Sequence, residues 1–383
     1  MYKTRVVDSV AQCSSLETGW NELLAHSNNP TVFNTFAWTW CWLQIYWQED
    51  YALKIILVES GEDLVALLPL YVQKKTGTCW FIGSGEPEAE EVASEYLDFI
   101  IHQNHAGSAE LATCINAQLE TLKRYRFVLV NCCASSYAAN LLRAHKRAWF
   151  TASGAVYKLA IQDSFADTTK AFSKNQLKNA RQCLNRFNAA PELEYVPLHS
   201  GVFAADWQAL QTLHQKDWTS RGKDGAFHSA RFSRFHALMH AQQPQIRQAF
   251  VALRKNAEGH NAETLAIHHF YVFGRHYCFY LAGTEKTRDS RLSPGLMLHV
   301  LAMQELSGQD ATYDFLKGST SNSYKAKFCG TGEAFYTITV FERSLRGSLH
   351  HWLARLKLYV RTMRKPESDI RKSGKEEQKA RSE

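Results

Sequence analysis

The sequence predicts an α/β protein made of two halves, each a mixed, largely antiparallel sheet flanked by helices. The first observation is the length of 383 residues, because a single hydrophobic core stops growing at roughly 250–300 residues. The second is the composition, 45% hydrophobic and 12% aromatic, which supplies a large core and excludes a disordered chain. The third is that helical and strand periodicities alternate along the chain. We expect one domain over residues 1–165, a second over residues 166–342, and a helix with a disordered tail over residues 343–383.

The first half opens with helices and continues with strands. Apolar residues recur at helical spacing over residues 14–26 and again over the aromatic stretch 33–47. Residues 51–59 and 64–73 have the pattern of two strands joined by a Gly-Glu-Asp turn. The other elements expected here are strands over residues 80–83, 127–130 and 155–159, a strand that ends at residue 101, and helices over residues 109–123 and 138–147. The glutamates between residues 86 and 95 are expected on a solvated loop or helix face.

The second half combines helices with an antiparallel meander of three strands, because short turns join the strand patterns. The expected elements are helices over residues 173–187, 202–218, 229–241 and 296–305, meander strands over 249–255, 264–273 and 275–282, and strands over 312–316 and 334–341. His268 and His269 point to opposite faces of their strand, so one of them faces inward. An inward imidazole beside a cleft could act as a general base, and a hydrogen-bonded structural histidine is the alternative.

The net charge of +7 is confined to one C-terminal segment. From Arg343 to Pro366 the chain holds seven Lys or Arg and no acid, whereas acids and bases balance in the rest of the chain. A neutral body argues against nucleic acid as a partner. Apolar residues between 345 and 363 recur at helical spacing. This basic helix, with residues 343–365 as its basic segment, either lies on an anionic membrane surface or docks its apolar stripe on the body.

The sequence predicts a cytoplasmic location, with the basic helix able to reach the inner face of the membrane. The first eleven residues carry charges and form no signal peptide pattern. No apolar run reaches the ~18 residues that a membrane span needs. The nine cysteines are scattered without a Cys-x-x-Cys pair, which predicts free thiols and no metal site.

The stretch from Tyr313 to Gly330 carries the main candidate site. Asp314 lies in a short strand of aromatic and β-branched residues, where a carboxylate is costly unless it is paired or used. Tyr324 and Lys325 follow within reach of the same strand end. A carboxylate, a phenol and an ammonium group so close together can bind a polar substrate or move a proton. A purely structural ion pair between Asp314 and Lys325 is the alternative.

The pattern strand-Asp-Phe-Leu-x-Gly, followed by Tyr-Lys-x-x-Phe-x-Gly, resembles the C-terminal signature of the CelD-like acetyltransferases. These belong to the GNAT superfamily and are similar to the Fem-type aminoacyltransferases of peptidoglycan synthesis. The resemblance extends over residues 33–341 and implies two GNAT-like domains with acetyl-CoA as the acyl donor. It implies that Phe33 and Trp38 line the substrate cleft, whereas their helical pattern alone predicts a packed core helix. It implies that Asp98 either orients the acceptor or caps a helix. It also implies that Lys178 and Arg181 on the basic helix meet phosphates, and a solvated helix face is the alternative.

The helix start at residues 293–296 is the expected site for the donor's diphosphate. Ser293 and Pro294 are strong start signals, and the free N–H groups of a helix that begins with Gly295 and Leu296 suit an anion. In GNAT enzymes the helix at this position holds the diphosphate of coenzyme A through a Gly-rich turn. This sequence departs from that turn, because only Gly295 is present. The departure leaves the acyl carrier open.

We interpret the chain as an acyltransferase that moves an acetyl or other acyl group from acyl-CoA to an amine or hydroxyl of a cell-envelope or polysaccharide precursor. Asp314, through His268 or a water, would take the proton of the acceptor, and Lys325 or Tyr324 would stabilise the developing negative charge.

The backbone N–H groups beside Tyr280, Leu281 and Ala282 would polarise the thioester carbonyl. Two alternatives stay open. One is a Fem-type transferase that uses aminoacyl-tRNA, and the other is a non-catalytic, membrane-associated assembly factor with the same fold.

Overall fold

The computed structural model describes residues 1–28, 30–199, 203–241, 246–256, 262–286, 292–319 and 323–363. The strands in these ranges are β1 (Tyr2–Val7), β2 (Tyr51–Ser60), β3 (Asp63–Gln73), β4 (Thr78–Phe81), β5 (Ile100–Ile101), β6 (Arg126–Cys133), β7 (Ala148–Ala160), β8 (Leu193–His199), β9 (Arg247–Lys255), β10 (Glu263–Phe273), β11 (His276–Thr284), β12 (Thr312–Gly318) and β13 (Glu333–Val340). The α-helices are α1 (Val10–Cys13), α2 (Glu17–Ala25), α3 (Phe36–Tyr46), α4 (Ala109–Thr121), α5 (Tyr137–Leu142), α6 (Phe165–Thr168), α7 (Lys174–Asn188), α8 (Phe203–Thr219), α9 (Ala230–Ala241), α10 (Pro294–Glu305), α11 (Ala326–Cys329) and α12 (Leu345–Met363).

A single mixed sheet joins the strands, in the order β1-β2-β3-β4-β6-β13-β7-β12-β11-β10-β9-β8, with β5 paired to β3. The predicted fold class, mixed sheets flanked by helices, is confirmed. The sheet runs without a break through both halves because β7 of the first half pairs antiparallel with β12 of the second. The strand β13 of the second half inserts between β6 and β7 of the first, and the domain limits expected at residues 165 and 342 remain predictions.

Residues 2–7 form the edge strand β1 on β2, an element about which no prediction is made from the sequence. Two expectations about individual elements are wrong. The helix expected over residues 138–147 ends at Leu142, and the strand expected over 155–159 already begins at Ala148. The physical reason is tertiary, because β13 pairs with β7 from Ala148 onward and draws that segment into the sheet.

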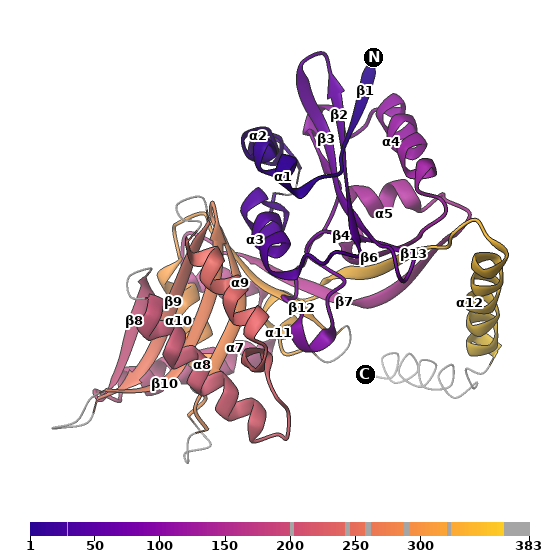
Figure 1. Cartoon of the computed structure of the whole chain (residues 1–383). Helices are drawn as coiled ribbons and strands as arrows, with labels where there is room; N and C mark the ends of the chain where they lie inside the picture. The colour runs from indigo at the N-terminus through magenta and orange to yellow at the C-terminus, as the bar shows by residue number, and fades with distance from the viewer. Residues whose placement is uncertain are drawn as a thin grey trace.

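Helices cover both faces of the sheet in each half (Figure 1). In the second half, α10 packs on one face and α8 on the other, as the two adjacent histidines of β10 show. The His268 ring contacts His299 of α10, with ring centroids 4.4 Å apart, and the His269 ring contacts Trp207 of α8 at 5.5 Å. The prediction that the two histidines point to opposite faces is confirmed, and both of them are buried.

The two halves share part of one hydrophobic core, because α3 of the first half packs against α9 of the second. Trp38 of α3 is fully buried and meets Phe235 of α9 edge to face, with ring centroids 4.8 Å apart. It also contacts Tyr271 of β10 at 5.3 Å. This contact holds the facing edges of the two halves in a fixed relation, which a site built from both halves requires.

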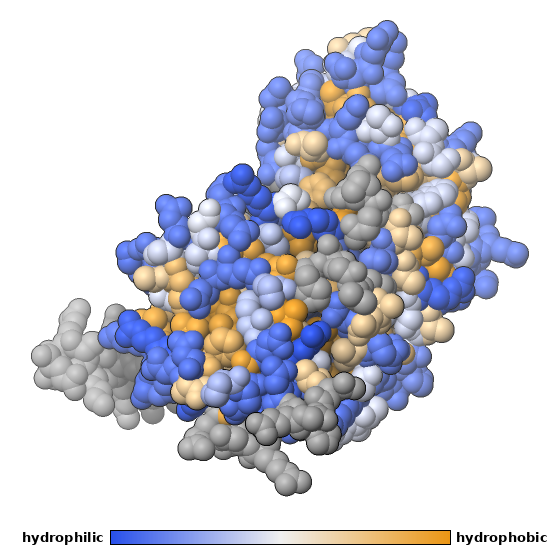
Figure 2. All heavy atoms as spheres, turned by 90° about the vertical axis from the view of Figure 1, so that its left-hand side faces the viewer, coloured by the Kyte–Doolittle hydropathy of each residue, from blue (hydrophilic) through white to orange (hydrophobic). Residues whose placement is uncertain are grey.

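The surface is mostly hydrophilic on the side shown in Figure 2, with hydrophobic residues visible in patches between hydrophilic ones. All nine cysteines are free thiols, as predicted. Among the helices that the structure describes, none combines the length and the apolar character that a membrane crossing requires.

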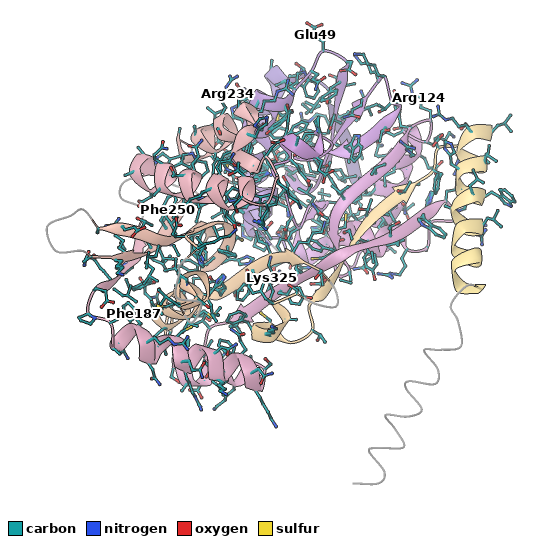
Figure 3. The ribbon with its side chains drawn as sticks, turned by 90° about the horizontal axis from the view of Figure 1, so that it is seen from below. Glu49, Arg124, Phe187, Arg234, Phe250 and Lys325 are labelled. Carbon is teal, nitrogen blue, oxygen red and sulfur yellow. The ribbon has the colours of Figure 1, made fainter. Side chains whose placement is uncertain are left out.

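Helix α12 stands apart from the body (Figures 1 and 3). Its apolar residues point to solvent, with Leu345 93% and Trp352 58% exposed. The alternative in which this helix docks its stripe on the body is therefore wrong for the side chains described, which end at Leu356. The expected disordered tail lies outside the described residues from residue 364 onward.

Candidate active site

Strands β11 and β12 are the parallel pair of the second half, and they separate part-way along their length. They pair only from His276 to Cys278 and from Thr312 to Asp314. Both strands continue beyond this pairing, to Thr284 and Gly318. The facing edges are then no longer joined, so a wedge opens at the carboxyl ends of the two strands. This is where open α/β sheets place ligands.

A cleft of about 1010 Å³ occupies this wedge and extends to the first half. Its walls are residues 279–282 of β11, residues 316 and 317 of β12, Tyr324 and Lys325, the end of α8 with the loop that follows it, and the segment 88–95 of the first half. Lys325 accordingly lies in the middle of the molecule, between the two halves (Figure 3). The site therefore depends on both halves.

Carboxylates line the cleft from both halves of the chain, whereas its lysines and arginines come from the second half alone. Three glutamates, Glu88, Glu91 and Glu95, come from the first half. The cations all come from the second half, and they are Arg221, Lys223, Lys317 and Lys325. Asp217 and Asp224 accompany them. Such a cleft can hold an amine beside the glutamates and a phosphate beside the cations.

Glu95 is the carboxylate most deeply placed in the cleft. It is only 6% exposed, and both of its oxygens accept from the backbone N–H of Lys317, at 3.0 and 2.8 Å. Burial, assisted by the charge of Asp314, raises the pKa of Glu95 to about 8, while Lys325 and Lys317 act in the opposite direction. A carboxylate with a pKa near neutrality can accept or donate a proton at physiological pH. The expectation of a solvated glutamate is wrong here.

The segment that carries Glu95 is irregular but strongly constrained. Ala93 and Tyr96 flank Glu95 with φ of 47° and 54°, a left-handed conformation that costs free energy in residues with a Cβ. Hydrogen bonds hold it there: the Trp38 indole donates to Ser94 Oγ at 2.8 Å, and the Tyr280 hydroxyl donates to the carbonyl of Val92. Strained backbone that is held this firmly is typical of functional sites.

Two residues that contact the segment around Glu95, or lie next to its partner Lys317, also have the left-handed backbone conformation. Leu316, next to Lys317, has φ of 59°, and Asn131 has φ of 55°. Asn131 donates from Nδ2 to the carbonyl of Ser94 at 2.7 Å and accepts from Lys317 Nζ at 3.0 Å. Four of the five non-glycine residues with positive φ in the described ranges thus surround one carboxylate.

Lys325 and Tyr324 line the cleft, as the sequence predicts for a site near the end of β12. The Lys325 ammonium donates to the carbonyls of Phe315 and Lys317, the second at 2.6 Å, and so holds the separated end of β12. Burial lowers its pKa, which the carboxylates of Glu95 and Asp314 oppose. Tyr324 is 45% exposed as a residue, and partial desolvation raises its pKa to about 12.

Asp314 does not line the cleft, so the expectation that it faces an open crevice is wrong. Its side chain is fully buried and accepts from the Tyr96 hydroxyl at 2.6 Å and from the backbone N–H of Leu316 at 2.7 Å. His276 Nε2 lies 2.8 Å from the same carboxylate. These contacts hold Tyr96, which follows Glu95, and Leu316, which precedes Lys317. Asp314 therefore positions the two elements that meet at Glu95.

Residues 174–326 match the family model described as an acetyltransferase (GNAT) domain. The second half of the chain carries a GNAT acetyltransferase domain. The wedge between β11 and β12 and the helix α10 that connects them belong to this domain. No curated protein matches the chain. The CelD-like subtype expected from the sequence is not established by the match.

Solved structures extend the likeness to both halves. The crystal structure of FemX superposes with a TM-score of 0.57 at 9% identity, covering 88% of this chain and 96% of FemX. The tandem GNAT protein from the clavulanic acid biosynthesis pathway gives 0.43 at 12% identity, covering 88% and 98%. The C-terminal domain of a putative lysylphosphatidylglycerol synthetase from Agrobacterium fabrum gives 0.47 at 12% identity, covering 89% and 95%. At such identities the likeness to FemX establishes the fold alone.

The residues expected to bind the acyl donor fall into two groups in the GNAT domain. Tyr280, Leu281 and Ala282 line the cleft, on the part of β11 that has separated from β12. The expected diphosphate site at residues 293–296 does not line it. Gly295 instead lies beside Thr284, at the end of β11, since a Cβ on this glycine would lie 3.3 Å from the threonine hydroxyl.

His268 cannot act as the base in this cleft. It is 1% exposed, lies on the α10 side of the sheet and is no part of the cleft wall. Burial lowers its pKa to about 3, so the imidazole stays neutral at physiological pH. The alternative of a hydrogen-bonded structural histidine is only partly met, because the ring is packed among aromatic rings, with Phe279 4.7 Å away between centroids, while its Nδ1 has no hydrogen-bond partner among the described residues.

The residues expected to bind the acceptor in the first half lie outside the cleft. Phe33 and Trp38 are buried against each other, with ring centroids 4.8 Å apart. Trp38 acts on the site indirectly, through its bond to Ser94. Asp98 accepts from the backbone N–H groups of Tyr137 and Ala138 at 2.7 and 2.8 Å, so it caps α5. Burial raises the pKa of Asp98 to about 7, against the effect of these bonds.

The basic helix α7 contributes nothing to the cleft. Lys178 and Arg181 are exposed to solvent and are absent from its walls. The helix packs against α10, on the other face of the sheet from α8. The expectation that these cations meet phosphates in the cleft is wrong.

His276, Cys278 and Asp314 could offer three ligand atoms to a metal, because these atoms lie within 4.8 Å of one another. The carboxylate already has donors of its own in Tyr96, Leu316 and His276. Burial raises the pKa of the Cys278 thiol, with a further contribution from Asp314, which keeps it protonated. Hydrogen bonds within the protein thus already occupy the Asp314 carboxylate.

Proposed function

We propose that the protein transfers an acetyl or other acyl group from acyl-CoA to an amine acceptor bound in the cleft, with Glu95 as the general base. One observation carries the proposal: a buried carboxylate with a pKa near 8 faces the wedge between β11 and β12 of a GNAT domain. No other cleft glutamate is held by a backbone N–H in the part of the chain that the structure describes.

The chain's own groups would act as follows. The Glu95 carboxylate removes a proton from the ammonium group of the acceptor, which then has a free lone pair for attack on a thioester carbonyl. Bound acyl-CoA supplies that thioester. Backbone N–H groups of residues 280–282, on the unpaired edge of β11, would polarise the carbonyl. Lys325 keeps the end of β12 in place and moderates the pKa of Glu95.

The distribution of charge fits both substrates. On the GNAT side of the cleft, Lys223 and Arg221, the latter in an ion pair with Asp217, suit the phosphates of the donor. Glu88 and Glu91 on the opposite side would attract a cationic acceptor to Glu95. We therefore favour an amino sugar or another primary amine of a cell-envelope precursor over a hydroxyl acceptor, in a cytoplasmic setting.

The test is a coupled assay for free thiol. Purified protein would be incubated with acetyl-CoA and a panel of amino sugars and primary amines, and coenzyme A release would be followed. Glu95→Gln should lose amine-dependent release while calorimetry still detects coenzyme A binding. The matched control is Glu49→Gln, an exposed glutamate outside the cleft, which should keep its activity. Amine-dependent turnover in Glu95→Gln equal to wild type would remove Glu95 from the chemistry.

The Fem-type alternative, transfer from aminoacyl-tRNA, remains a second candidate because the helix start at Gly295 lacks the Gly-rich turn. The superposition on FemX supports the shared fold and does not separate the donors. Titration with tRNA and with coenzyme A does separate them. Binding of tRNA without binding of coenzyme A would replace the acyl-CoA proposal. Binding of neither would favour the non-catalytic assembly factor.

A further inference from the structure

Helix α12 exposes a continuous apolar stripe. Leu345, Leu349, Trp352 and Leu356 follow one another at intervals of four, three and four residues, which places them on one helical face. Their exposed fractions are 93%, 54%, 58% and 40%, and Leu353 beside them is 38% exposed. Apart from Met1, Val6 and Tyr324, the large hydrophobic residues exposed in the described ranges all belong to this stripe.

The root of the helix is firmly attached to the first half, so the stripe is presented in a defined orientation. The Arg147 guanidinium donates to the carbonyls of Phe341 at 2.9 Å and Glu342 at 2.5 Å. Arg343 forms an ion pair with Glu120 of α4 at 2.8 Å. Beyond this root the helix projects away from the body (Figures 1 and 3). Its stripe therefore needs an external partner if it is to be covered.

The charge around the stripe selects the kind of partner. Arg346 and Arg355 are exposed beside it, and the chain carries no acid from Arg343 to Pro366. A tryptophan with leucines on one face and arginines at its borders matches the boundary between acyl chains and anionic headgroups. A second copy of this basic helix would be repelled by like charge.

We propose that α12 binds an anionic phospholipid surface, lying along it with the Leu345–Leu356 face buried at the headgroup boundary. The helix would be about 28 Å long, which suits a helix that lies along the surface. Binding would hold the cleft near acceptors that are anchored in the membrane. The proposal does not require the acyl transfer proposed above.

Flotation of the full-length protein with lipid vesicles tests the proposal. Vesicles of phosphatidylcholine with about 30% phosphatidylglycerol should retain the protein, and pure phosphatidylcholine should retain it at least about tenfold less. Raising NaCl from about 0.05 M to about 0.5 M should release it, because screening weakens the headgroup contacts.

Two variants separate the apolar and the ionic parts. Trp352→Ser, and the double variant Arg346→Glu with Arg355→Glu, should each lower retention about tenfold. The matched control is Lys178→Glu with Arg181→Glu on α7, a basic exposed helix that presents no such stripe and should leave retention unchanged. All these side chains are at the surface, so circular dichroism and the melting temperature should match wild type.

Three results would overturn the proposal. The first is equal retention by neutral and anionic vesicles, and the second is retention that the α12 variants do not change. The third is that wild type does not bind vesicles and forms a concentration-dependent dimer, which Trp352→Ser abolishes. This result would assign the stripe to a second copy of the chain.

Discussion

Replacing Glu95 with glutamine is the perturbation that tests the cleft most directly. General-base catalysis contributes about 10²–10⁴-fold, so Glu95→Gln should lower amine-dependent kcat by that factor, equivalent to about 3–5 kcal/mol in the barrier. Because the pKa of Glu95 is about 8, only about a tenth of the wild-type protein carries the basic form at pH 7. The wild-type rate should therefore rise about tenfold per pH unit below pH 8 and then level off.

The same shift predicts a change in stability. The folded state holds the Glu95 proton up to about pH 8, whereas the ordinary pKa is 4.5. The protonated Glu95 therefore makes its full contribution to the free energy of unfolding below about pH 4.5. This contribution decreases between pH 4.5 and 8, by at most about 1.4 kcal/mol per pH unit. Glu95→Gln should remove this part of the slope, as urea unfolding at several pH values would show.

Comparison with the variant isolates the contribution of Glu95, because Asp98 and Glu86 titrate in both proteins. Burial raises the pKa of each of these two carboxyls to about 7. If Glu95→Gln and wild type show the same pH–rate profile and the same slope of stability with pH, the reasoning about this carboxylate is refuted. Glu49→Gln serves again as the control, and it should change neither the pH–rate profile nor the dependence of stability on pH.

Three further substitutions test the surroundings of the site. Ser94→Ala leaves the buried indole N–H of Trp38 without its acceptor, so urea unfolding should show a loss of about 1–3 kcal/mol. Lys325→Met removes a cation that lowers the pKa of Glu95, so the pH–rate profile should move to higher pH, and an unmoved profile would contradict the coupling. Gly283→Ala would place a Cβ 2.7 Å from a side chain of α8, so stability should fall by about 1–3 kcal/mol, and an unchanged unfolding midpoint would exclude this close approach.

The local sequence pattern predicted the cleft residues that the second half of the chain contributes at the ends of β11 and β12. Tyr324 and Lys325 follow the Asp314 strand within a few residues, and residues 280–282 end the strand that precedes the connecting helix. Their place at a strand end depends on interactions between neighbours in sequence, which periodicity and turn residues reveal. The same signals predict the exposed basic face of α7 and the stripe of α12. The residues near such a helix face in the sequence do not show whether it contacts a ligand or solvent.

Glu95 shows why the other half was missed. It lies within a run of glutamates typical of a solvated loop, and its partner Lys317 is 222 positions away in the chain. The apolar residues that follow it, Tyr96, Leu97 and Phe99, are the one local signal that this segment turns inward. His268 illustrates the converse error, because alternation predicts that one histidine of the pair faces inward and does not reveal that both faces are covered.

The sequence by itself determined the fold class, the strand pairs joined by short turns, the free cysteines and the amphipathic character of α12, because each follows from contacts between residues close in the chain. The tertiary structure decided which acid faces the cleft, that Asp314 is buried beside Tyr96 and His276, and that β13 inserts between two strands of the first half. These outcomes arise where segments hundreds of residues apart exclude water together, and burial by distant segments sets the protonation of a carboxylate.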